Sequence, residues 1–430
     1  MSVKSGFHNE CEETASVDEL RAIQTERLRA VVRHVYDHNT TQRARFREAG
    51  VTPGDIRDLS DLRRIPTMDK ALFGTSYPLG LSCVDKKYVV QMHMSSGSTG
   101  KPVVMPYTQG DLEQWTLCMA RCLRMAGTEP GDVIQITPSF GLFNGGFGFY
   151  HGAEALGLFV LPTGAGNTQR QIRLAKDFGT RVITGVVSYG IRLMEVLQEL
   201  GEDLPDLEIG IFGAETFSDS MKKRIAEGLG IEVFDIYGLT ESGGVGLGMD
   251  CPAHDGLHLW EDQYIVEIVN PKTGEPVTDG ESGELVITSL TREALPVIRF
   301  RTGDLTRIVS RGRCACGRTH VRIAPLTGRT DDMLIVKGMN FFPREVEEIL
   351  MEIPGVGSNY QIIVEEIDGI KDLQIHVEAA PQITSGMIGK KLQDALCFLP
   401  KCEVHPVGQL PRQEGKAKRV FYKRVEDPLR

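Results

Sequence analysis

The sequence of 430 residues predicts an α/β fold with a large N-terminal domain and a small C-terminal α+β domain. Three observations support this prediction. Short β-rich runs alternate with helical stretches in the first half, strands separated by turn signals fill residues 258–325, and the pattern changes again after residue 330. A chain of this length is expected to form two or three domains with ample core.

The N-terminal domain is expected to open with an amphipathic helix over residues 16–39. This segment has apolar residues at helical spacing and an acidic first turn. Short strands that end in glycine or polar turns are expected in VIQITPS, RVITGVV, LEIGIFGAE and IEVFDIYGLTE, with helices at 169–177 and 218–228. Such alternation predicts a largely parallel sheet with helices on it, and ligands are expected at the carboxyl ends of its strands.

Residues 258–325 are expected to form an antiparallel, barrel-like subdomain, because turn signals separate YIVEIVNPKTGEPV, SGELVITSL and PVIRFRTGDLTRIV. The C-terminal domain is then predicted from a helix in PREVEEILMEI, strands in NYQIIVEEI and LQIHVEAA, another helix and a final strand. Charged and polar residues near 329–332 separate the two patterns, so the expected domains are 1–329 and 330–430.

Composition excludes several classes of protein. A net charge of −10 argues against a general binder of nucleic acid or anionic membranes. No apolar run approaches the ~20 residues that span a bilayer, and the first residues show no secretory pattern. Nine cysteines without export are expected to be reduced thiols or metal ligands, so a cytoplasmic setting is expected.

A loop rich in glycine and hydroxyl groups lies in MHMSSGSTGKPVVMPYT, residues 92–108. Its spacing is not that of a Walker A loop, because only two residues separate Gly97 from Gly100 and Pro102 follows Lys101. Glycines would let successive backbone N–H groups face an anion, and the hydroxyls add donors. An ordinary polar turn between two strands is the alternative interpretation.

Six stretches in order resemble the adenylate-forming superfamily, and most closely its phenylacetate–coenzyme A ligase branch. They are SSGSTGKP, GAETFSD, YGLTESGG, FRTGDLTRI, GRTDDMLIVKGMNFFPREVEEIL and LPRQEGKAKRV. The resemblance covers the chain from about residue 20 to its end. It implies a large adenylate-forming N-terminal domain and a small, mobile C-terminal domain.

The resemblance implies an ATP-dependent, AMP-forming ligase that converts an aryl or arylacetic acid through an acyl adenylate to its CoA thioester. ATP, Mg²⁺ and CoA are therefore the expected cofactor and substrates. Two enzymatic alternatives stay open: loading of the acyl group on a carrier protein, or release of an AMP adduct. A regulatory protein that only binds nucleotide would not need Lys416, Glu241 and Asp304 together.

By resemblance, Tyr237 packs on the adenine, Asp304 binds the ribose hydroxyls, and Arg329 approaches the same region. The 95–101 loop would hold the β- and γ-phosphates. The expected ATP-binding set is Ser95, Ser96, Gly97, Ser98, Thr99, Gly100, Lys101, Gly213, Ala214, Glu215, Asp235, Tyr237, Gly238, Asp304 and Arg329.

The expected catalytic residues are Lys416, Glu241 and Thr240. Lys416 resembles the lysine that bridges the substrate carboxylate and the α-phosphate, and its neighbours Lys418 and Arg419 are expected to be solvated. Thr240 would contact phosphate, and Glu241 would bind Mg²⁺, for which a carboxylate is a suitable hard oxygen ligand.

Two further residues follow from the domain rotation that the resemblance implies. Asp331 is the expected hinge, with Asp332 as a competing candidate. Gly338 is expected near the incoming pantetheine of CoA, where the absence of a Cβ permits close backbone approach.

The acyl pocket is expected in PSFGLFNGGFGFYHGAE, residues 138–154, whose aromatic rings and glycines suit a flat substrate. Its named residues are Phe140, Phe143, Gly145, Gly146, Tyr150 and His151. A glycine-rich helix that packs aromatics into the core is the alternative. Phenylacetate ligases often have His-Tyr where this chain has Tyr150-His151, so hydroxylated, amino-substituted and indolic acids stay open.

A structural zinc site is expected from Cys251, His258, Cys314 and Cys316, because three thiolates and one imidazole satisfy tetrahedral Zn²⁺. His254 or His320 could replace His258, and buried free thiols are the alternative. The expected partners are small molecules, without nucleic acid or membrane, and a homodimer is left open.

Overall fold

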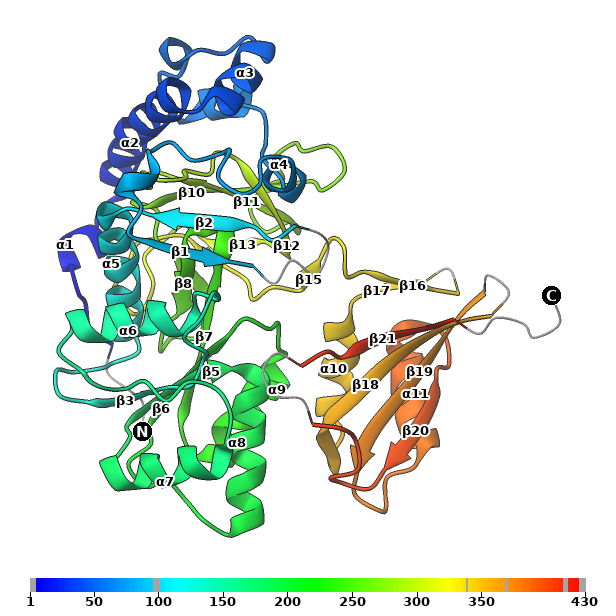
Figure 1. Ribbon diagram of the computed structural model, residues 1–430. Coiled ribbons are helices and arrows are strands. Elements are labelled where there is room, and N and C mark those ends of the chain that lie inside the picture. Colours follow the sequence, from blue (N-terminus) through cyan, green and yellow to red (C-terminus); the bar gives the residue numbers. More distant parts are fainter. Residues whose placement is uncertain (1–4, 96–100, 338, 368–369, 413–416, 425–430) are drawn as a thin grey trace.

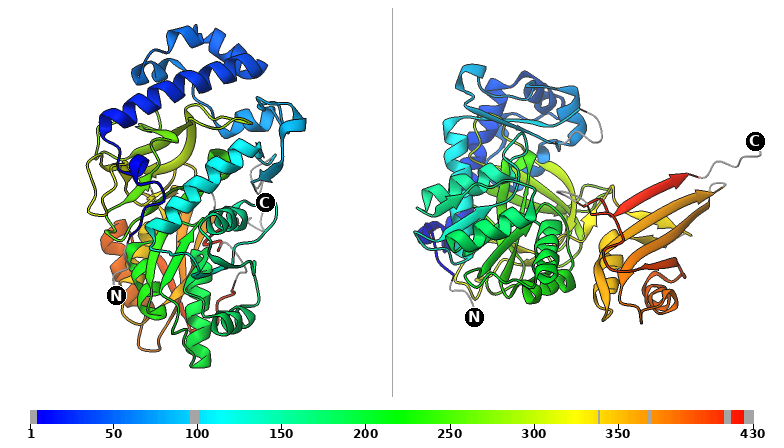
Figure 2. Two further views of the ribbon diagram at one scale, coloured as in Figure 1. Left: turned by 90° about the vertical axis from the view of Figure 1, so that its left-hand side faces the viewer. Right: turned by 60° about the horizontal axis from the view of Figure 1, so that its bottom comes forward.

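The computed structural model describes residues 5–95, 101–337, 339–367, 370–412 and 417–424. Two bodies are visible in Figures 1 and 2: a large N-terminal body and a smaller C-terminal one beside it. The expected residues Ser96, Gly97, Ser98, Thr99, Gly100, Gly338 and Lys416 lie outside the described ranges.

The first helices cover one end of the large body (Figure 1). The predicted helix at 16–39 is confirmed as α2 (Val17–His38). Its N-terminus is closed by a capping box, in which Ser16 Oγ accepts from the Glu19 N–H and the Glu19 carboxylate accepts from the Ser16 N–H. The neighbouring helices are α1 (Glu10–Glu13), α3 (Thr40–Glu48) and α4 (Lys70–Thr75), with 3₁₀ turns η1 (Pro53–Asp55), η2 (Leu59–Arg64) and η3 (Lys86–Tyr88).

A nine-stranded mixed sheet forms the centre of the large body, with the order β13-β14-β9-β8-β7-β6-β5-β3-β4. The predicted parallel region is confirmed in β3 to β7, whereas β8, β9, β13 and β14 continue the sheet antiparallel. The strands are β3 (Val133–Ile136), β4 (Phe159–Leu161), β5 (Val182–Val186), β6 (Ile209–Gly213), β7 (Glu232–Leu239), β8 (Gly244–Asp250), β9 (Leu257–Leu259), β13 (Ile308–Ser310) and β14 (Arg322–Ile323).

Helices cover both faces of this sheet. Successive strand side chains point to opposite faces, so that Ile211 joins one hydrophobic core and Phe212 the other. The helices α5 (Gln109–Met125) and α6 (Gly145–Ala155) contribute to the first core; α7 (Thr168–Phe178), α8 (Val187–Leu200) and α9 (Asp219–Leu229) contribute to the second. The predicted helices at 169–177 and 218–228 are thereby confirmed as α7 and α9.

The strands of residues 258–325 are antiparallel as predicted, but they do not form one barrel. β10 (Tyr264–Val269), β11 (Gly283–Ser289), β12 (Phe300–Thr306) and β15 (Gly328–Arg329) make a separate sheet, while β9, β13 and β14 join the central one. The split follows from β8, which pairs with β7 on one side and β9 on the other. A hairpin of β1 (Gln91–Met94) and β2 (Val104–Tyr107) stands beside these strands.

The C-terminal body contains a short hairpin and a four-stranded sheet of order β20-β19-β18-β21. Its helices cover one face of that sheet, where Ile362, Val364 and Ile375 are buried. The sequence predicted one strand after the last helix, but the structure contains two, β20 and β21. The elements are β16 (Leu334–Val336), β17 (Met339–Phe341), α10 (Pro343–Met351), β18 (Val356–Ile367), β19 (Ile370–Ala379), α11 (Ser385–Leu396), β20 (Lys401–His405) and β21 (Val420–Arg424).

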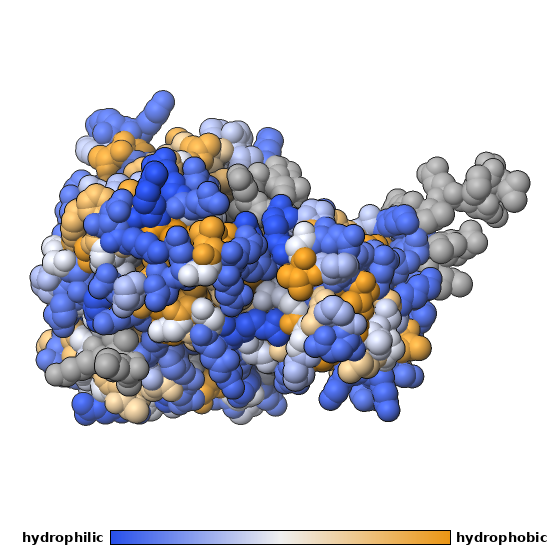
Figure 3. Space-filling model, turned by 90° about the horizontal axis from the view of Figure 1, so that it is seen from below, coloured by the Kyte–Doolittle hydropathy of each residue, from blue (hydrophilic) through white to orange (hydrophobic). Residues whose placement is uncertain are grey.

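The face seen from below is predominantly hydrophilic (Figure 3). Seen from below, polar side chains cover most of both bodies, and apolar side chains gather in small patches (Figure 3). Within the described ranges, no helix is both long and apolar enough to cross a bilayer.

Candidate active site

A cleft of about 720 Å³ is lined by residues of both bodies. The N-terminal side is formed by the ends of β6, β7 and β12 and by the chain around β15, and the C-terminal side by α10, β18 and β21. Seven of the residues expected at the nucleotide line it: Ala214, Glu215, Asp235, Tyr237, Gly238, Asp304 and Arg329. The cleft therefore lies at the carboxyl ends of parallel strands, where the alternating pattern predicted a ligand.

A buried carboxylate forms the centre of the cleft wall. The Tyr237 hydroxyl donates to Asp304 Oδ2 at 2.5 Å, and the Arg329 guanidinium donates to Oδ1 at 2.6 Å. Asp304 and Arg329 face each other because they are directly paired in the register of β12 and β15. Burial raises the pKa of Asp304, while Arg329 and the Tyr237 hydroxyl oppose the rise. These two donors hold the carboxylate in one orientation.

A second carboxylate is left with an open oxygen. Thr240 and Glu241 form the 3₁₀ turn η4 (Thr240–Ser242) directly after β7. Glu241 is 4% exposed, and in the described chain its Oε1 accepts no hydrogen bond; the Lys70 ammonium of α4 is 3.9 Å away. Burial raises the pKa of Glu241. A buried oxygen without a hydrogen bond fits a metal ligand better than a structural carboxylate.

Glu215, which lines the cleft as expected of a nucleotide-site residue, also joins two segments of the chain. It accepts from the Ser188 N–H at 2.8 Å, the Ser188 hydroxyl at 3.1 Å and the Ala417 N–H at 2.5 Å. The carboxylate therefore links the start of α8 to the C-terminal segment that follows Lys416. Gly213 ends β6, and a Cβ there would approach the Ile236 carbonyl oxygen to 2.3 Å, which explains why this position is glycine.

The hydroxyl-rich loop joins β1 to β2. At its base, the Ser95 hydroxyl accepts from the Val103 N–H at 2.9 Å, and the Ser95 N–H donates to the Val103 carbonyl at 3.0 Å. The Lys101 ammonium lies 5.6 Å from the centre of the Tyr77 ring. The loop thus begins and ends on paired strands, which fixes the position of its two ends.

The predicted acyl-pocket residues surround the start of α6. Phe140 contacts the Tyr150 ring edge-on at 6.4 Å, whereas Phe143 is 53% exposed. The ring of His151 lies 5.7 Å from that of Trp115, and its buried Nε2 has no hydrogen-bond partner among the described residues.

The two glycines at the start of α6 allow close backbone contact. A Cβ on Gly146 would lie 2.8 Å from the Ser139 carbonyl oxygen and 2.9 Å from that of Pro138. On Gly145, a Cβ would lie 3.3 Å from the Pro138 Cβ. Gly146 therefore serves the packing of the helix on the preceding loop, in addition to any space left for a substrate.

The four expected zinc ligands lie together. One potential ligand atom from each of Cys251, His258, Cys314 and Cys316 lies within 4.8 Å of the other three. The sulfurs of Cys251 and Cys314 are 3.7 Å apart, and the Cys316 sulfur lies 3.4 Å from His258 Nε2. A tetrahedral ion with Zn–S bonds of about 2.3 Å holds two sulfurs about 3.8 Å apart, so this spacing fits that ion.

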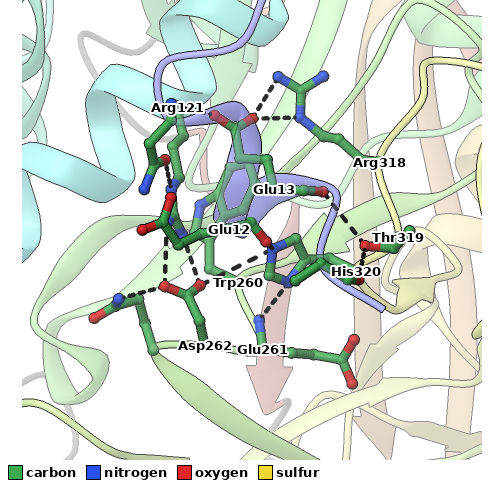
Figure 4. A network of polar contacts seen from close by, with 12 residues as sticks. Glu12, Glu13, Arg121, Trp260, Glu261, Asp262, Arg318, Thr319 and His320 are labelled. Carbon is green, nitrogen blue, oxygen red and sulfur yellow. Dashed lines mark hydrogen bonds and ion pairs between the residues drawn. The ribbon is translucent and has the colours of Figure 1, made fainter. Parts of the chain in front are cut away.

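The two alternative histidines lie elsewhere. His254 contacts Asp250 and Glu232 through its two ring nitrogens, at 3.1 and 3.4 Å. His320 Nδ1 accepts from the Glu261 N–H, and its Nε2 contacts the Glu12 carbonyl oxygen at 3.1 Å (Figure 4). His258 instead directs Nδ1 at the His320 carbonyl oxygen, 3.1 Å away, which leaves Nε2 facing the thiols.

Sequence reasoning missed several cleft residues. Tyr360 of β18 lines the cleft and donates to Glu347 Oε2 at 2.7 Å, and Arg419 lies over the Tyr360 ring at 4.7 Å. Arg419 was expected to be a solvated neighbour, which is wrong. Lys70, near Glu241, was also missed. No local pattern marks Tyr360 or Lys70, because they reach the site only through the packing of distant segments.

Comparison with known proteins identifies the family. Residues 3–291 match the AMP-binding enzyme model, and residues 338–424 match the AMP-binding enzyme C-terminal domain. The chain is 41% identical to phenylacetate-coenzyme A ligase of Escherichia coli (strain K12), covering 95% of this chain and 96% of that protein. It is 40% identical to the enzyme of the same name from Pseudomonas putida, with 96% of each covered.

The fold of solved relatives agrees over nearly the whole chain. A structure of 2-hydroxyisobutyryl-CoA ligase in the postadenylation state aligns with a TM-score of 0.89 at 26% identity, covering 96% of this chain and 91% of that one. The same ligase in the thioesterification state aligns with a TM-score of 0.72, covering 96% and 92%. The chain therefore belongs to the AMP-binding enzymes and, within them, to the family of the phenylacetate–coenzyme A ligases, which are acid–thiol ligases.

Proposed function

We propose that this enzyme activates an aryl or arylacetic acid with ATP and transfers the acyl group from AMP to CoA. The observation that carries the proposal is the cleft, where the Tyr237–Asp304–Arg329 group faces Tyr360 and Arg419 of the other domain. A carboxylate is a poor acyl donor, and the acyl adenylate supplies AMP as a better leaving group. Both domains contribute to the site, as expected when two half-reactions share one nucleotide.

In the proposed complex, each residue of the cleft binds a part of the nucleotide. Asp304 accepts from the ribose hydroxyls, and Tyr237 and Arg329 keep its carboxylate oriented for them. The 95–101 loop and Thr240 contact the phosphates, where backbone N–H groups and hydroxyls are good anion donors. Asp235, at the wall beside Tyr237, is placed to accept from the exocyclic amine of adenine.

We assign the bridging of the substrate carboxylate and the α-phosphate to Lys416. The support is the neighbouring Ala417, whose N–H donates to Glu215 in the cleft wall. A positioned ammonium there would stabilise charge as it moves between carboxylate and phosphate. Lys416→Ala should abolish adenylate formation but preserve thioester formation from a supplied acyl adenylate; equal loss of both would refute the role.

Glu241 is the proposed ligand of Mg²⁺. Its buried oxygen, which accepts no hydrogen bond from the described residues, provides the hard ligand that this ion prefers, and the ion when bound would neutralise phosphate charge. Cys251, His258, Cys314 and Cys316 are the proposed ligands of a structural Zn²⁺, because four protein ligands leave no open position for catalysis. Reduced thiols and the use of ATP and CoA favour a cytoplasmic setting.

The acid itself is best sought among aryl and arylacetic acids. The curated relatives are named for phenylacetate, and the start of α6 is lined by Phe140, Phe147 and Tyr150. His151 has a buried nitrogen that is open to a hydrogen bond. Ring-substituted acids with a hydroxyl or amino group therefore belong in the panel beside phenylacetate.

The direct test incubates the enzyme with ATP, Mg²⁺ and a panel of these acids, with and without CoA, and identifies products by mass spectrometry. We expect a CoA thioester with stoichiometric AMP for one acid or a narrow group. AMP adducts that accumulate equally with and without CoA would overturn the proposal, in favour of a carrier-protein acceptor or an adenylyltransferase.

A further inference from the structure

A second cluster of potential metal ligands lies on the C-terminal domain, outside the cleft lining and separate from the cluster of Cys251, His258, Cys314 and Cys316. It consists of His376 on β19 and of Glu403 and His405 on β20. The two strands run parallel, with β20 at the edge of the sheet, and their register places His376 directly opposite Glu403. Glu403 and His405 are two residues apart, so their side chains share the sheet face of His376.

The distances in this cluster match those around one ion. One nitrogen of each imidazole and one carboxylate oxygen lie within 4.8 Å of one another. His376 Nδ1 and His405 Nε2 are 3.2 Å apart, and His405 Nε2 is 3.6 Å from Glu403 Oε1. Two nitrogens bound at about 2.05 Å to a tetrahedral ion are separated by about 3.3 Å, so little movement is needed.

The surroundings also suit metal binding. The histidine side chains are 19% and 17% exposed, so packing limits their rotation, while Glu403 is 63% exposed and can adjust. The imidazole rings are stacked with centres 5.2 Å apart. Burial lowers the pKa of His376, which favours the neutral form that binds metal.

Another close histidine pair lacks the arrangement of a metal site. His34 and His38 of α2 have ring centres 4.7 Å apart. However, His34 Nε2 contacts the Glu293 carbonyl oxygen at 2.8 Å, and His38 Nδ1 contacts the His34 carbonyl oxygen at 2.9 Å. Among the described residues, no group of three or more potential metal ligands includes His34 or His38. The cluster on β19 and β20 therefore differs from a mere pair of close histidines, because it also contains a carboxylate.

The geometry points to a second divalent metal site, in which His376, Glu403 and His405 bind a late first-row transition-metal ion such as Zn²⁺, Ni²⁺ or Co²⁺. Two imidazoles and one carboxylate are suitable ligands for these ions, and three protein ligands leave coordination positions for water. The bound ion joins the edge strand β20 to β19. The site is thus open and exchangeable, unlike the closed cluster of four ligands.

The test uses tag-free holoenzyme that keeps the metal acquired during expression, dialysed against Co²⁺ and analysed for cobalt and zinc. We expect the wild-type enzyme to take up one equivalent of cobalt more than the double variant His376→Asn, His405→Asn, with equal zinc in both. His38→Asn is the matched control and should bind cobalt like the wild type. Hydrogen exchange should show slower exchange of β20 amides on addition of cobalt in the wild type and in His38→Asn, but not in the double variant.

Two results would overturn the site. One is equal cobalt uptake by the wild type and the double variant. The other is cobalt uptake that is lost equally in His38→Asn, which would indicate general histidine binding. Glu403→Gln tests the site even if the double variant misfolds, because this exposed side chain can change without affecting the core. It should weaken cobalt binding severalfold while both imidazole rings remain. Unchanged cobalt affinity in Glu403→Gln would contradict the proposed role of the Glu403 carboxylate as a ligand.

Discussion

Asp304 shows how a single side chain depends on its neighbours. Its carboxylate has one oxygen bonded to Tyr237 and the other to Arg329, and each donor comes from a different sheet. Both oxygens retain lone pairs for the ribose hydroxyls, because a carboxylate offers about four acceptor positions. Its buried setting makes any lost hydrogen bond costly.

Replacing Asp304 by Asn should lower kcat/KM for ATP roughly ten- to hundredfold, since hydrogen bonds to a charged group are worth about 1.5–3 kcal/mol. The amide keeps the shape but presents one donor where an acceptor is needed. Steady-state kinetics with varied ATP measure the loss. Tyr237→Phe is the control, because it removes only the phenol hydroxyl; an equal or larger loss in that variant would contradict direct ribose binding by Asp304.

The sequence predicted seven of the residues that line the cleft, because six belong to short motifs and Asp235 lies two residues before one of them. Tyr360, Lys70 and Arg419 could not be assigned in the same way. Tyr360 looks like any buried strand aromatic, and its position at the cleft depends on how two separately folded bodies pack. For the metal cluster, the sequence indicated His258 as a ligand but left His254 and His320 as alternatives. Only the fold distinguishes His258 from them.

Asp235 predicts a pH dependence. Burial raises the pKa of Asp235 to about 7, and the nearby Asp250 adds to the shift. The carboxyl is therefore protonated below that pH and ionised above it, and only the ionised form accepts hydrogen bonds with both oxygens. If it accepts from the adenine amine, KM for ATP should fall as the pH rises through about 7.

Kinetics between about pH 6 and pH 8 test this, with Asp235→Asn as the comparison. The amide oxygen of the variant accepts at every pH, so its KM profile should be flatter than that of the wild type. The same slope in both proteins would assign the titration to another group, such as Glu241 or Asp304, whose pKa values burial also raises.

At the scale of elements, the residues that follow the Cys314–Cys316 loop hold the N-terminal segment. The loop that carries Cys314 and Cys316 continues into Arg318, whose guanidinium pairs with Glu13 at 2.6 Å, with both side chains fully buried. His320 then contacts the Glu12 carbonyl oxygen (Figure 4). Segments about 300 residues apart in the sequence are joined in this way. No local pattern of residues 5–16 indicates the contact.

Cys316→Ser should therefore loosen the N-terminal segment as well as its own loop. With metal binding coupled to folding, we expect Tm to fall by roughly 5 °C or more and the amides of residues 5–16 to exchange faster. Differential scanning calorimetry, hydrogen exchange and zinc analysis measure these effects. Cys11→Ser, an exposed thiol of that same segment, is the control. Unchanged zinc content and exchange in Cys316→Ser would refute both the site and the coupling.

The helix α6 was predicted as a pocket wall, with core packing as the alternative, and the structure gives its glycines a packing role. Gly146→Ala should destabilise the enzyme by about 1–3 kcal/mol, because the new Cβ meets two carbonyl oxygens that are part of the backbone and cannot rotate away. Urea denaturation measures the difference. Gly141→Ala, in the preceding loop, is the matched control, since no described atom lies within 4 Å of its Cβ. Equal stability of the two variants would contradict the close contact.

For the whole molecule, polar contacts lie beside buried apolar residues where the two bodies meet, because one apolar cluster includes residues of both bodies. Arg224 of α9 donates to the carbonyl oxygens of Val356 and Met351 at 2.7 and 3.0 Å, and the Ser218 N–H donates to Glu347 at 2.8 Å. The polar contacts can exchange with water when the domains separate. The structure aligns better with the postadenylation state of 2-hydroxyisobutyryl-CoA ligase, at a TM-score of 0.89, than with its thioesterification state, at 0.72. The two bodies are therefore arranged more as in the postadenylation structure.

The chain between the two bodies is short. β15 ends at Arg329 in a sheet of the large body, and β16 begins at Leu334. Asp331, in this connection, accepts from Arg329 Nε at 2.9 Å. The proposed rotation needs free change of φ in this segment, and proline fixes φ near −65°.

Asp331→Pro should retain adenylate formation, because the present arrangement already places Ala417 at the cleft, and should lose thioester formation from a supplied acyl adenylate by at least about tenfold. Pyrophosphate exchange and CoA thioester assays measure the two half-reactions. The ion pair with Arg329 is also lost in Asp331→Asn, which keeps a free φ and should perform both reactions. Equal impairment of thioester formation in the two variants would assign the effect to the ion pair. Normal turnover with CoA in Asp331→Pro would instead place the hinge elsewhere, with Asp332 as the next residue to test.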